Sequence, residues 1–160
     1  MTYFITFGCY GSHLHGEEAG SVDREHNLPG SRLLLQNPKR VALEKRKMRQ
    51  APYVLDQKRR EVVLQAMLHV STDRGWTLRA GHVRTNHVHA VVDADVRPEM
   101  VMHAFKSYAS KFLNQTKIDH AGRKRWVRHG STRWLWKEEN IAAAVRYVVE
   151  EQGEPMAVYG

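Results

Sequence analysis

The chain has 160 residues, enough for one domain that buries roughly two-thirds of its unfolded surface. Hydrophobic residues make up 42% and charged residues 26% of it, as in an ordinary globular protein, and no apolar run reaches the ~20 residues of a membrane span. The single cysteine excludes an internal disulfide and a thiolate metal cluster. The N-terminus has neither a basic segment nor a cleavage site. We therefore expect no signal peptide, no membrane partner and a cytoplasmic location.

The balance of charged residues indicates what kind of partner the protein binds. Twenty-five Lys and Arg against 17 Asp and Glu give a net charge of +8, with ten histidines besides. The basic residues cluster at 37–50, 57–60 and 122–134, and the third cluster also contains Trp126 and Trp134. Basic side chains attract a phosphate backbone, and tryptophans offer stacking surfaces for unpaired bases. The pattern favours a nucleic-acid partner over a solvated basic surface or anionic lipid.

In chain order, the first predicted element is a strand at 2–10, which is rich in aromatic and β-branched residues. Residues 11 to about 36 are rich in Gly, Ser, Asp and Asn and predict a long loop. A charged helical stretch at 39–50 ends before Pro52. Apolar residues at helical spacing then predict a helix over 56–73, with Asp56 as its N-cap.

The second half of the chain alternates strands and helices. Strands are predicted at 76–85 and 87–94, joined by a tight turn at 85–86. Pro98 opens an amphipathic helix, because proline is favoured at the first helical position. A strand at 132–138 and a helix at about 140–152 follow, and Gly153 is a typical helix stop.

This order predicts the fold. With the loop and short helix inserted at about 11–56 set aside, the elements read βαββαβ plus one helix. We expect an α+β, ferredoxin-like antiparallel sheet with helices on one face, and a C-terminal helix outside the basic unit. Neither repeats nor a linker divide the chain, so residues 1–160 are predicted to form one domain. The second face of the sheet stays open for a site.

Two histidines mark that open face. Strand alternation sends His87 and His89 to one side and the intervening Val88 to the other. Two neutral imidazoles at this spacing can bind one divalent ion, but a stable site needs a third ligand.

The last predicted helix can supply the third ligand. Tyr147 and Glu151 lie one helical turn apart on a face beside the apolar stripe. If that face looks across the sheet, Glu151 completes a site of two histidines and one carboxylate, with Tyr147 next to the metal. Considered alone, Tyr147 can equally be a half-buried packing residue, and Glu151 can be an ordinary carboxylate at the end of a helix. A second pair, His13 and His15, falls in the predicted loop and is interpreted as polar loop or as DNA contacts.

The ordered set of motifs resembles the single-tyrosine HUH transposases, including the REP-associated tyrosine transposases and related insertion-sequence enzymes. The resemblance runs from "YFITFG" through "NHVHAVV", the helix with Lys106 and "GSTRWLW" to "AVRYVVEEQG". It covers most of the chain apart from the tail and parts of the 11–56 segment.

The resemblance implies cleavage and rejoining of single-stranded DNA, often near a hairpin, through a 5′-phosphotyrosine link. It makes Tyr147 the nucleophile and His87 and His89 the ligands of Mg²⁺ or Mn²⁺, with no nucleotide cofactor. The family's third ligand, often an amide, commonly follows the tyrosine by one turn. That position is Glu151 here, and Glu150 or Gln152 are the alternatives. Relatives act as monomers or as homodimers that exchange this helix, so Tyr147 can serve its own chain or a partner.

Further residues are expected to hold the DNA, as backbone-phosphate ligands or as stacking surfaces. They are Lys106, Lys111, Arg123, Lys124, Arg125, Trp126, Arg128, Arg133 and Trp134. Alternative functions are a non-catalytic ferredoxin-like nucleic-acid-binding module, a replication-initiator-type HUH nicking enzyme, or a small iron-dependent oxygenase.

Overall fold

A computed structural model describes residues 1–12 and 50–160 of the chain. The predicted loop, nearly all of the helical stretch at 39–50, and His13 and His15 fall outside the described residues. The described residues form, in chain order, β1 (Thr2–Cys9), α2 (Gln57–Arg74), β2 (Thr77–Val83), β3 (His87–Asp93), α3 (Pro98–Gln115), β4 (Trp126–Leu135), α4 (Glu138–Glu150) and β5 (Ala157–Tyr159).

The sheet has the topology expected of a ferredoxin-like fold. Its five strands lie in the order β4-β1-β3-β2-β5, and every neighbouring pair is antiparallel. β3, the strand with His87 and His89, therefore lies at the centre, with β1 on one side and β2 on the other. The α+β prediction is confirmed, and the helix with Tyr147 follows the basic unit as α4.

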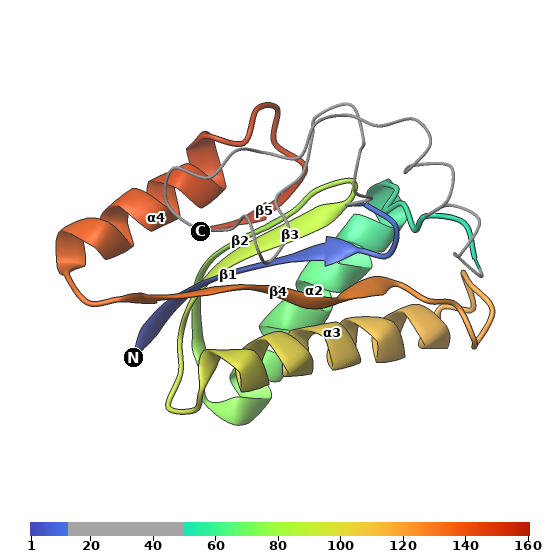
Figure 1. Ribbon diagram of the computed structural model, residues 1–160, viewed down its shortest axis with the longest axis horizontal. Helices are drawn as coiled ribbons and strands as arrows, with labels where there is room; N and C mark the ends of the chain where they lie inside the picture. The colour runs from blue at the N-terminus through green and yellow to red at the C-terminus, as the bar shows by residue number, and fades with distance from the viewer. Residues whose placement is uncertain (13–49) are drawn as a thin grey trace, which may run out of the picture.

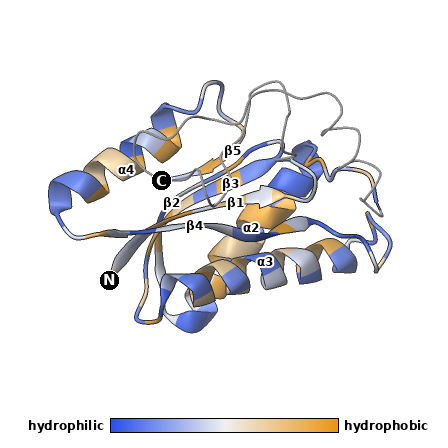
Figure 2. Ribbon diagram, viewed as in Figure 1, coloured by the Kyte–Doolittle hydropathy of each residue, from blue (hydrophilic) through white to orange (hydrophobic). Residues whose placement is uncertain are grey.

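Helices cover the two faces of the sheet unequally (Figure 1). α2 and α3 pack side by side on one face, over Ile5, Val88 and Val92. The part of α2 behind the strands is hydrophobic and its first turn hydrophilic (Figure 2). α4 lies on the opposite face, where its apolar stripe packs on Ala80 and Val91. Within the described ranges, no helix is both long and apolar enough to cross a membrane.

Two strands differ from the sequence prediction. β4 begins at Trp126 and ends at Leu135, whereas a strand at 132–138 was predicted from the sequence. Its first half is half-buried or exposed, because it is an edge strand paired only with β1, and so it carries little hydrophobic pattern. β5 was not predicted because three residues are too few for a periodic signal. It pairs with β2 and closes the other edge of the sheet.

Gly130 lets β4 approach β1 closely. A Cβ at this position would lie 2.5 Å from the carbonyl oxygen of Thr6 and 2.6 Å from the sulfur of Met102. The register of the two strands shifts between Phe7 and Cys9, next to this contact. Glycine at position 130 therefore sets how near β4 lies to the part of β1 that contains Thr6.

A buried ion-pair network holds the end of α3 and the following loop to α2. The Asp119 carboxylate accepts hydrogen bonds from Arg59 Nη2 at 2.7 Å, the Tyr53 hydroxyl at 2.5 Å and Arg125 Nε at 3.3 Å. Arg125 Nη2 also donates to Asn114 Oδ1 at 2.8 Å. Burial opposes ionisation of Asp119, but the hydrogen bonds from Arg59 and Tyr53 outweigh it. The pKa of this carboxyl therefore lies below its usual range.

We predict that Asp119→Ala lowers the free energy of unfolding by about 3 kcal/mol, because it leaves Arg125 buried without its counter-ion. In the unaltered protein, the depressed pKa means that Asp119 stabilises the fold above the unfolded-state pKa, and that this stabilisation is lost as the pH falls through the folded-state pKa. Urea unfolding of both proteins from neutral to acidic pH measures both effects. Equal stability at neutral pH would contradict the prediction.

Candidate active site

His87 and His89 lie on the face of β3 that α4 covers. Val88 between them is fully buried on the opposite face, against α2 and α3. The centroids of the two imidazole rings are 4.8 Å apart. His87 is half-buried and His89 is buried. The predicted alternation is thus what the structure shows, and it brings the two imidazoles together on one side of the sheet.

Hydrogen bonds orient both imidazole rings. His89 Nδ1 lies 2.8 Å from the hydroxyl of Thr6 on the neighbouring strand. His87 Nδ1 donates to Asn86 Oδ1 at 2.8 Å. When Nδ1 of a histidine donates, as that of His87 does, Nε2 carries the lone pair that can bind a metal.

The environment keeps His89 neutral. Burial, together with the neighbouring His87 and His82, lowers the pKa of His89 to about 4. A hydrogen bond with the Gln152 side chain acts in the opposite direction but does not offset them. A histidine must be neutral to act as a ligand, so His89 is ready to bind a metal at neutral pH without losing a proton first.

α4 places Tyr147 next to these histidines. Ile141, Ala144 and Val148 form its buried stripe, and Tyr147 lies beside this stripe with 42% of its surface exposed. The Tyr147 ring centroid is 5.8 Å from that of His89 and 5.9 Å from that of Phe4. The structure therefore joins the two motifs that lie about sixty residues apart in the sequence.

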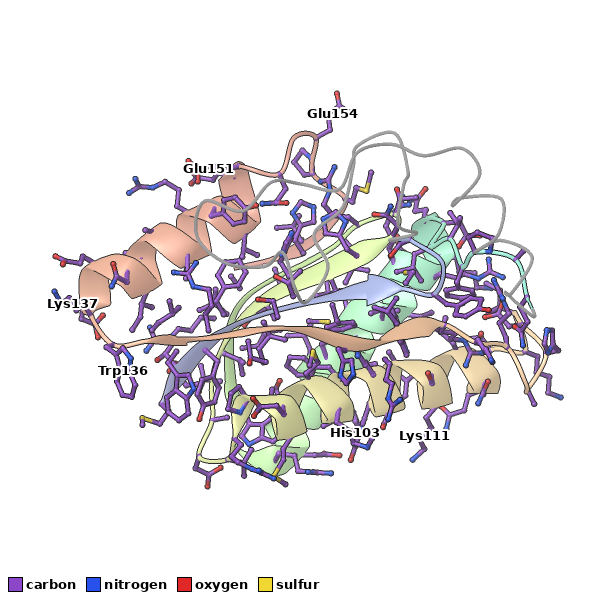
Figure 3. The ribbon with its side chains drawn as sticks, viewed as in Figure 1. His103, Lys111, Trp136, Lys137, Glu151 and Glu154 are labelled. Atoms are coloured by element: carbon purple, nitrogen blue, oxygen red, sulfur yellow. The ribbon has the colours of Figure 1, made fainter. Side chains whose placement is uncertain are left out.

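Gln152, and not Glu151, reaches back toward the histidines. Gln152 Nε2 donates to the Tyr147 carbonyl oxygen at 3.1 Å, and the side chain also hydrogen-bonds with His89. Glu151 is the exposed C-cap of α4 and lies at the C-terminal end of the helix, opposite Lys137 (Figure 3). α4 ends at Glu150, so helical spacing no longer applies beyond it. Gly153 follows with φ +80°, a turn conformation that favours glycine.

A third histidine, which the sequence reasoning did not single out, fixes the end of α4. His82 on β2 is fully buried and is the direct neighbour of His89 across the sheet. Its Nδ1 donates to the Val148 carbonyl at 2.9 Å, and its Nε2 accepts from the Met156 N–H at 3.1 Å. Burial lowers its pKa, which suits this neutral tautomer. Strand alternation places position 82 on the same face as His89, and that was the available signal.

In residues 1–12 and 50–160, no three His, Cys, Asp or Glu side chains lie close enough together to hold a metal ion. Amide oxygens are donors of another type. The Gln152 side-chain oxygen is such a donor, since amide oxygens are suitable ligands of hard cations.

Four of the predicted DNA-binding residues have their polar groups engaged within the fold. Arg125 is buried in the Asp119 network, in contrast to the phosphate contact that its basic cluster suggested. Lys106 donates to the carbonyls of Val127 and His129, and burial lowers its pKa. Arg123 bonds to Gln50 and Ala51, and the Trp126 indole donates to Lys106 and Ser110.

The other five remain on the surface. They are Lys111, Lys124, Arg128, Arg133 and Trp134. Lys111 lies on the side of α3 away from the sheet (Figure 3). Trp134 stacks on Trp136, with ring centroids 5.2 Å apart and planes 13° from parallel, and Trp136 is 70% exposed. Sequence reasoning missed Trp136, although its spacing of two from Trp134 on a strand was the signal.

The chain is similar to a known protein family and to a solved structure. Residues 45–150, more than half of the chain, match the protein family described as "Transposase IS200 like". A solved structure of a REP-associated tyrosine transposase bound to a REP hairpin is also similar, at 11% identity and a TM-score of 0.48. The similarity covers 92% of this chain and 63% of that one. No curated protein matches the chain.

We predict that the imidazole C–H resonances of His89 titrate near pH 4 in an NMR experiment on the metal-free protein, as burial and His87 disfavour its charged form. The folded protein then binds this proton less tightly than the unfolded chain, whose histidine pKa is about 6.5. His89 therefore reduces stability as the pH falls below about 6.5. A midpoint near 6.5 for His89 would contradict the buried environment described here.

Proposed function

The chain belongs to the IS200-like transposase family, and we propose from this premise that it cleaves and rejoins single-stranded DNA through a covalent link to Tyr147. Family membership indicates a DNA-binding protein of the transposase type. The observation that carries the finer proposal is the position of Tyr147, a partly exposed phenol whose ring lies 5.8 Å from that of a neutral, buried histidine.

The donor set fits a divalent cation. We propose that His87, His89 and Gln152 hold Mg²⁺ or Mn²⁺, with Gln152 in place of the Glu151 expected from helical spacing. Support comes from the Gln152 amide, whose nitrogen donates to the Tyr147 carbonyl while the side chain also hydrogen-bonds with His89. A bound cation would polarise the scissile phosphate and neutralise part of its charge.

Tyr147 supplies the nucleophile in the proposed reaction. Its phenolic oxygen forms a bond to phosphorus as the bond from phosphorus to the 3′ oxygen breaks. The phenol loses its proton and the departing 3′ oxygen gains one. The strand is left with a free 3′-hydroxyl and a 5′-phosphotyrosine. Rejoining reverses the step, and no ATP is needed because one phosphodiester bond replaces another.

We propose that Tyr147 serves the histidines of its own chain. α4 packs on β2 and β3 of the same chain through Ile141, Ala144 and Val148. His82 then fixes the helix end, and β5 pairs with β2. An exchange of α4 between two copies would have to break these contacts, so a monomer suffices for the reaction.

The DNA is proposed to contact the exposed basic residues Lys111, Lys124, Arg128 and Arg133 and the stacked pair Trp134 and Trp136. Exposed cations hold phosphates without reading sequence, and flat aromatic rings accept unpaired bases. Because the solved structure mentioned above contains a REP hairpin, single-stranded DNA with a hairpin is the first probe to use.

The central test is a covalent adduct. Hairpin-bearing single-stranded DNA incubated with the protein and Mn²⁺ is expected to yield a denaturant-resistant protein–DNA species that Tyr147→Phe abolishes. Tyr159→Phe is the matched control, because Tyr159 is equally exposed but lies on β5. An adduct that survives Tyr147→Phe would exclude this nucleophile. DNA binding with no adduct in any protein would favour the non-catalytic module.

Metal affinity distinguishes the proposed third ligands. We expect Gln152→Ala to weaken Mn²⁺ binding by about tenfold or more, since it removes an amide oxygen next to His89. Glu151→Ala, with its side chain exposed at the end of α4, should bind Mn²⁺ as the unaltered protein does. Titration calorimetry measures both. The opposite pattern would restore Glu151 as the ligand.

Mixing two inactive variants tests whether Tyr147 acts within its own chain. Tyr147→Phe lacks the nucleophile and His87→Ala lacks a proposed metal ligand. If each chain uses its own groups, the mixture forms no more adduct than either variant alone. Adduct formation that rises with the concentration of the mixture would instead show helix exchange between copies.

A further inference from the structure

A cavity of about 490 Å³ opens beside Tyr147. It lies between β1, β3, β4 and α4, and His89 and Tyr147 both line it. Pockets that bind small ligands have volumes of roughly 300–1,000 Å³, so this one is large enough for part of a substrate. Because the cavity contacts both the proposed nucleophile Tyr147 and the proposed metal ligand His89, a molecule bound there lies next to the site of cleavage.

Three polar side chains in this cavity have no partner within the described part of the chain. They are Ser131 and Arg133 on β4 and Asn140 in the first turn of α4. In contrast, the Thr6 hydroxyl in the same lining is occupied by His89. The described lining contains Arg133 and no Asp or Glu, so these residues suit an anionic group.

The remaining lining is apolar. Phe4 and Leu135 come from the sheet and Ala143 and Ala144 from α4. Phe4 is half-buried, and its ring lies 5.9 Å from that of Tyr147 and 5.8 Å from that of His89. A cavity with an apolar, partly aromatic wall, an arginine and an amide provides what an unpaired nucleotide needs: a surface for the base, a cation for the phosphate and a polar group for the base edge.

We propose that this cavity takes the unpaired nucleotide next to the phosphate that Tyr147 attacks. In this arrangement Arg133 contacts a phosphate of that nucleotide, the base packs against Phe4, and the Asn140 amide hydrogen-bonds with the base edge. Asn140 is thereby a specificity-determining residue, because an amide donates and accepts and so distinguishes among bases. The inference rests on the proposed cleavage for the position of the nucleotide, but not for its binding.

Binding is measured first, on the non-cleaving Tyr147→Phe background with labelled hairpin-bearing single-stranded DNA at fixed salt. Arg133→Ala is expected to raise the dissociation constant about tenfold, because a charge-assisted hydrogen bond to phosphate is lost. Arg97→Ala is the matched control: it removes the same charge from an exposed position outside the cavity. If the two substitutions raise the dissociation constant equally, Arg133 contributes only general electrostatic attraction to DNA, and its proposed phosphate contact in the cavity is overturned.

Base preference is measured second, with Tyr147 present. The substrate is hairpin-bearing DNA whose single-stranded flank is randomised, and the DNA in the covalent adduct is sequenced. We expect Asn140→Ala to lose the preference at one position beside the link while still forming adduct. Glu139→Ala, on the same helical turn but outside the cavity, should keep it. An unchanged preference in Asn140→Ala would overturn the inference.

The two arms separate failure of the inference from failure of the proposed function. If the protein forms the adduct but Arg133→Ala and Asn140→Ala both behave like their controls, the nucleotide site is rejected and the cleavage chemistry is retained. If no adduct forms but Arg133→Ala binds the DNA clearly more weakly than Arg97→Ala does, the nucleotide site is supported and the cleavage chemistry is rejected.

Discussion

His82 is the constraint on which the candidate site depends. This buried imidazole donates to the Val148 carbonyl of α4 and accepts from the N–H of Met156 just before β5. Only the neutral ring protonated at Nδ1 satisfies both bonds. The two bonds fix the end of α4 and the start of the tail to the same point on β2. The turn between them, which contains Gln152 and Gly153, is thereby held against the histidines of β3.

Burial keeps His82 and His89 neutral, and hydrogen bonds orient the imidazoles of the site. Three histidines, at positions 82, 87 and 89, lie close together on a sheet face, and each charge that formed there would repel the others. Burial and this proximity depress the pKa of His89 to about 4. Thr6 and Asn86 then orient the rings through Nδ1. Neutral, oriented imidazoles are the state that metal ligation requires.

Much of the fold could be predicted from the sequence, because the relevant signals are local and periodic. Alternation at His87, Val88 and His89 indicated both the buried and the open face of β3, and the apolar stripe of α4 indicated which side packs. Elements with little periodic pattern of their own could not be predicted. β5 is too short to show a period, and the edge position of β4 hides its first half.

Individual side chains were harder to assign, for the same reason. Helical spacing selected Glu151, but α4 ends one residue earlier and the turn that follows directs Gln152 toward His89. A basic cluster placed Arg125 among surface cations, whereas the distant Asp119 pairs with it in the interior. Trp136 was missed although it is more exposed than Trp134. For Glu151 and Arg125 the deciding feature lies beyond the end of a helix or elsewhere in the fold, whereas for Trp136 the local spacing from Trp134 was available.

The central claim is that the two imidazoles on β3 and the turn after α4 form a metal site beside Tyr147. Crystals soaked in Mn²⁺ and measured for anomalous scattering test it most directly. The claim predicts one strong peak about 2.2 Å from Nε2 of both His87 and His89, with the Gln152 side-chain oxygen as a further ligand. A peak elsewhere, with none between these two nitrogens, would contradict it.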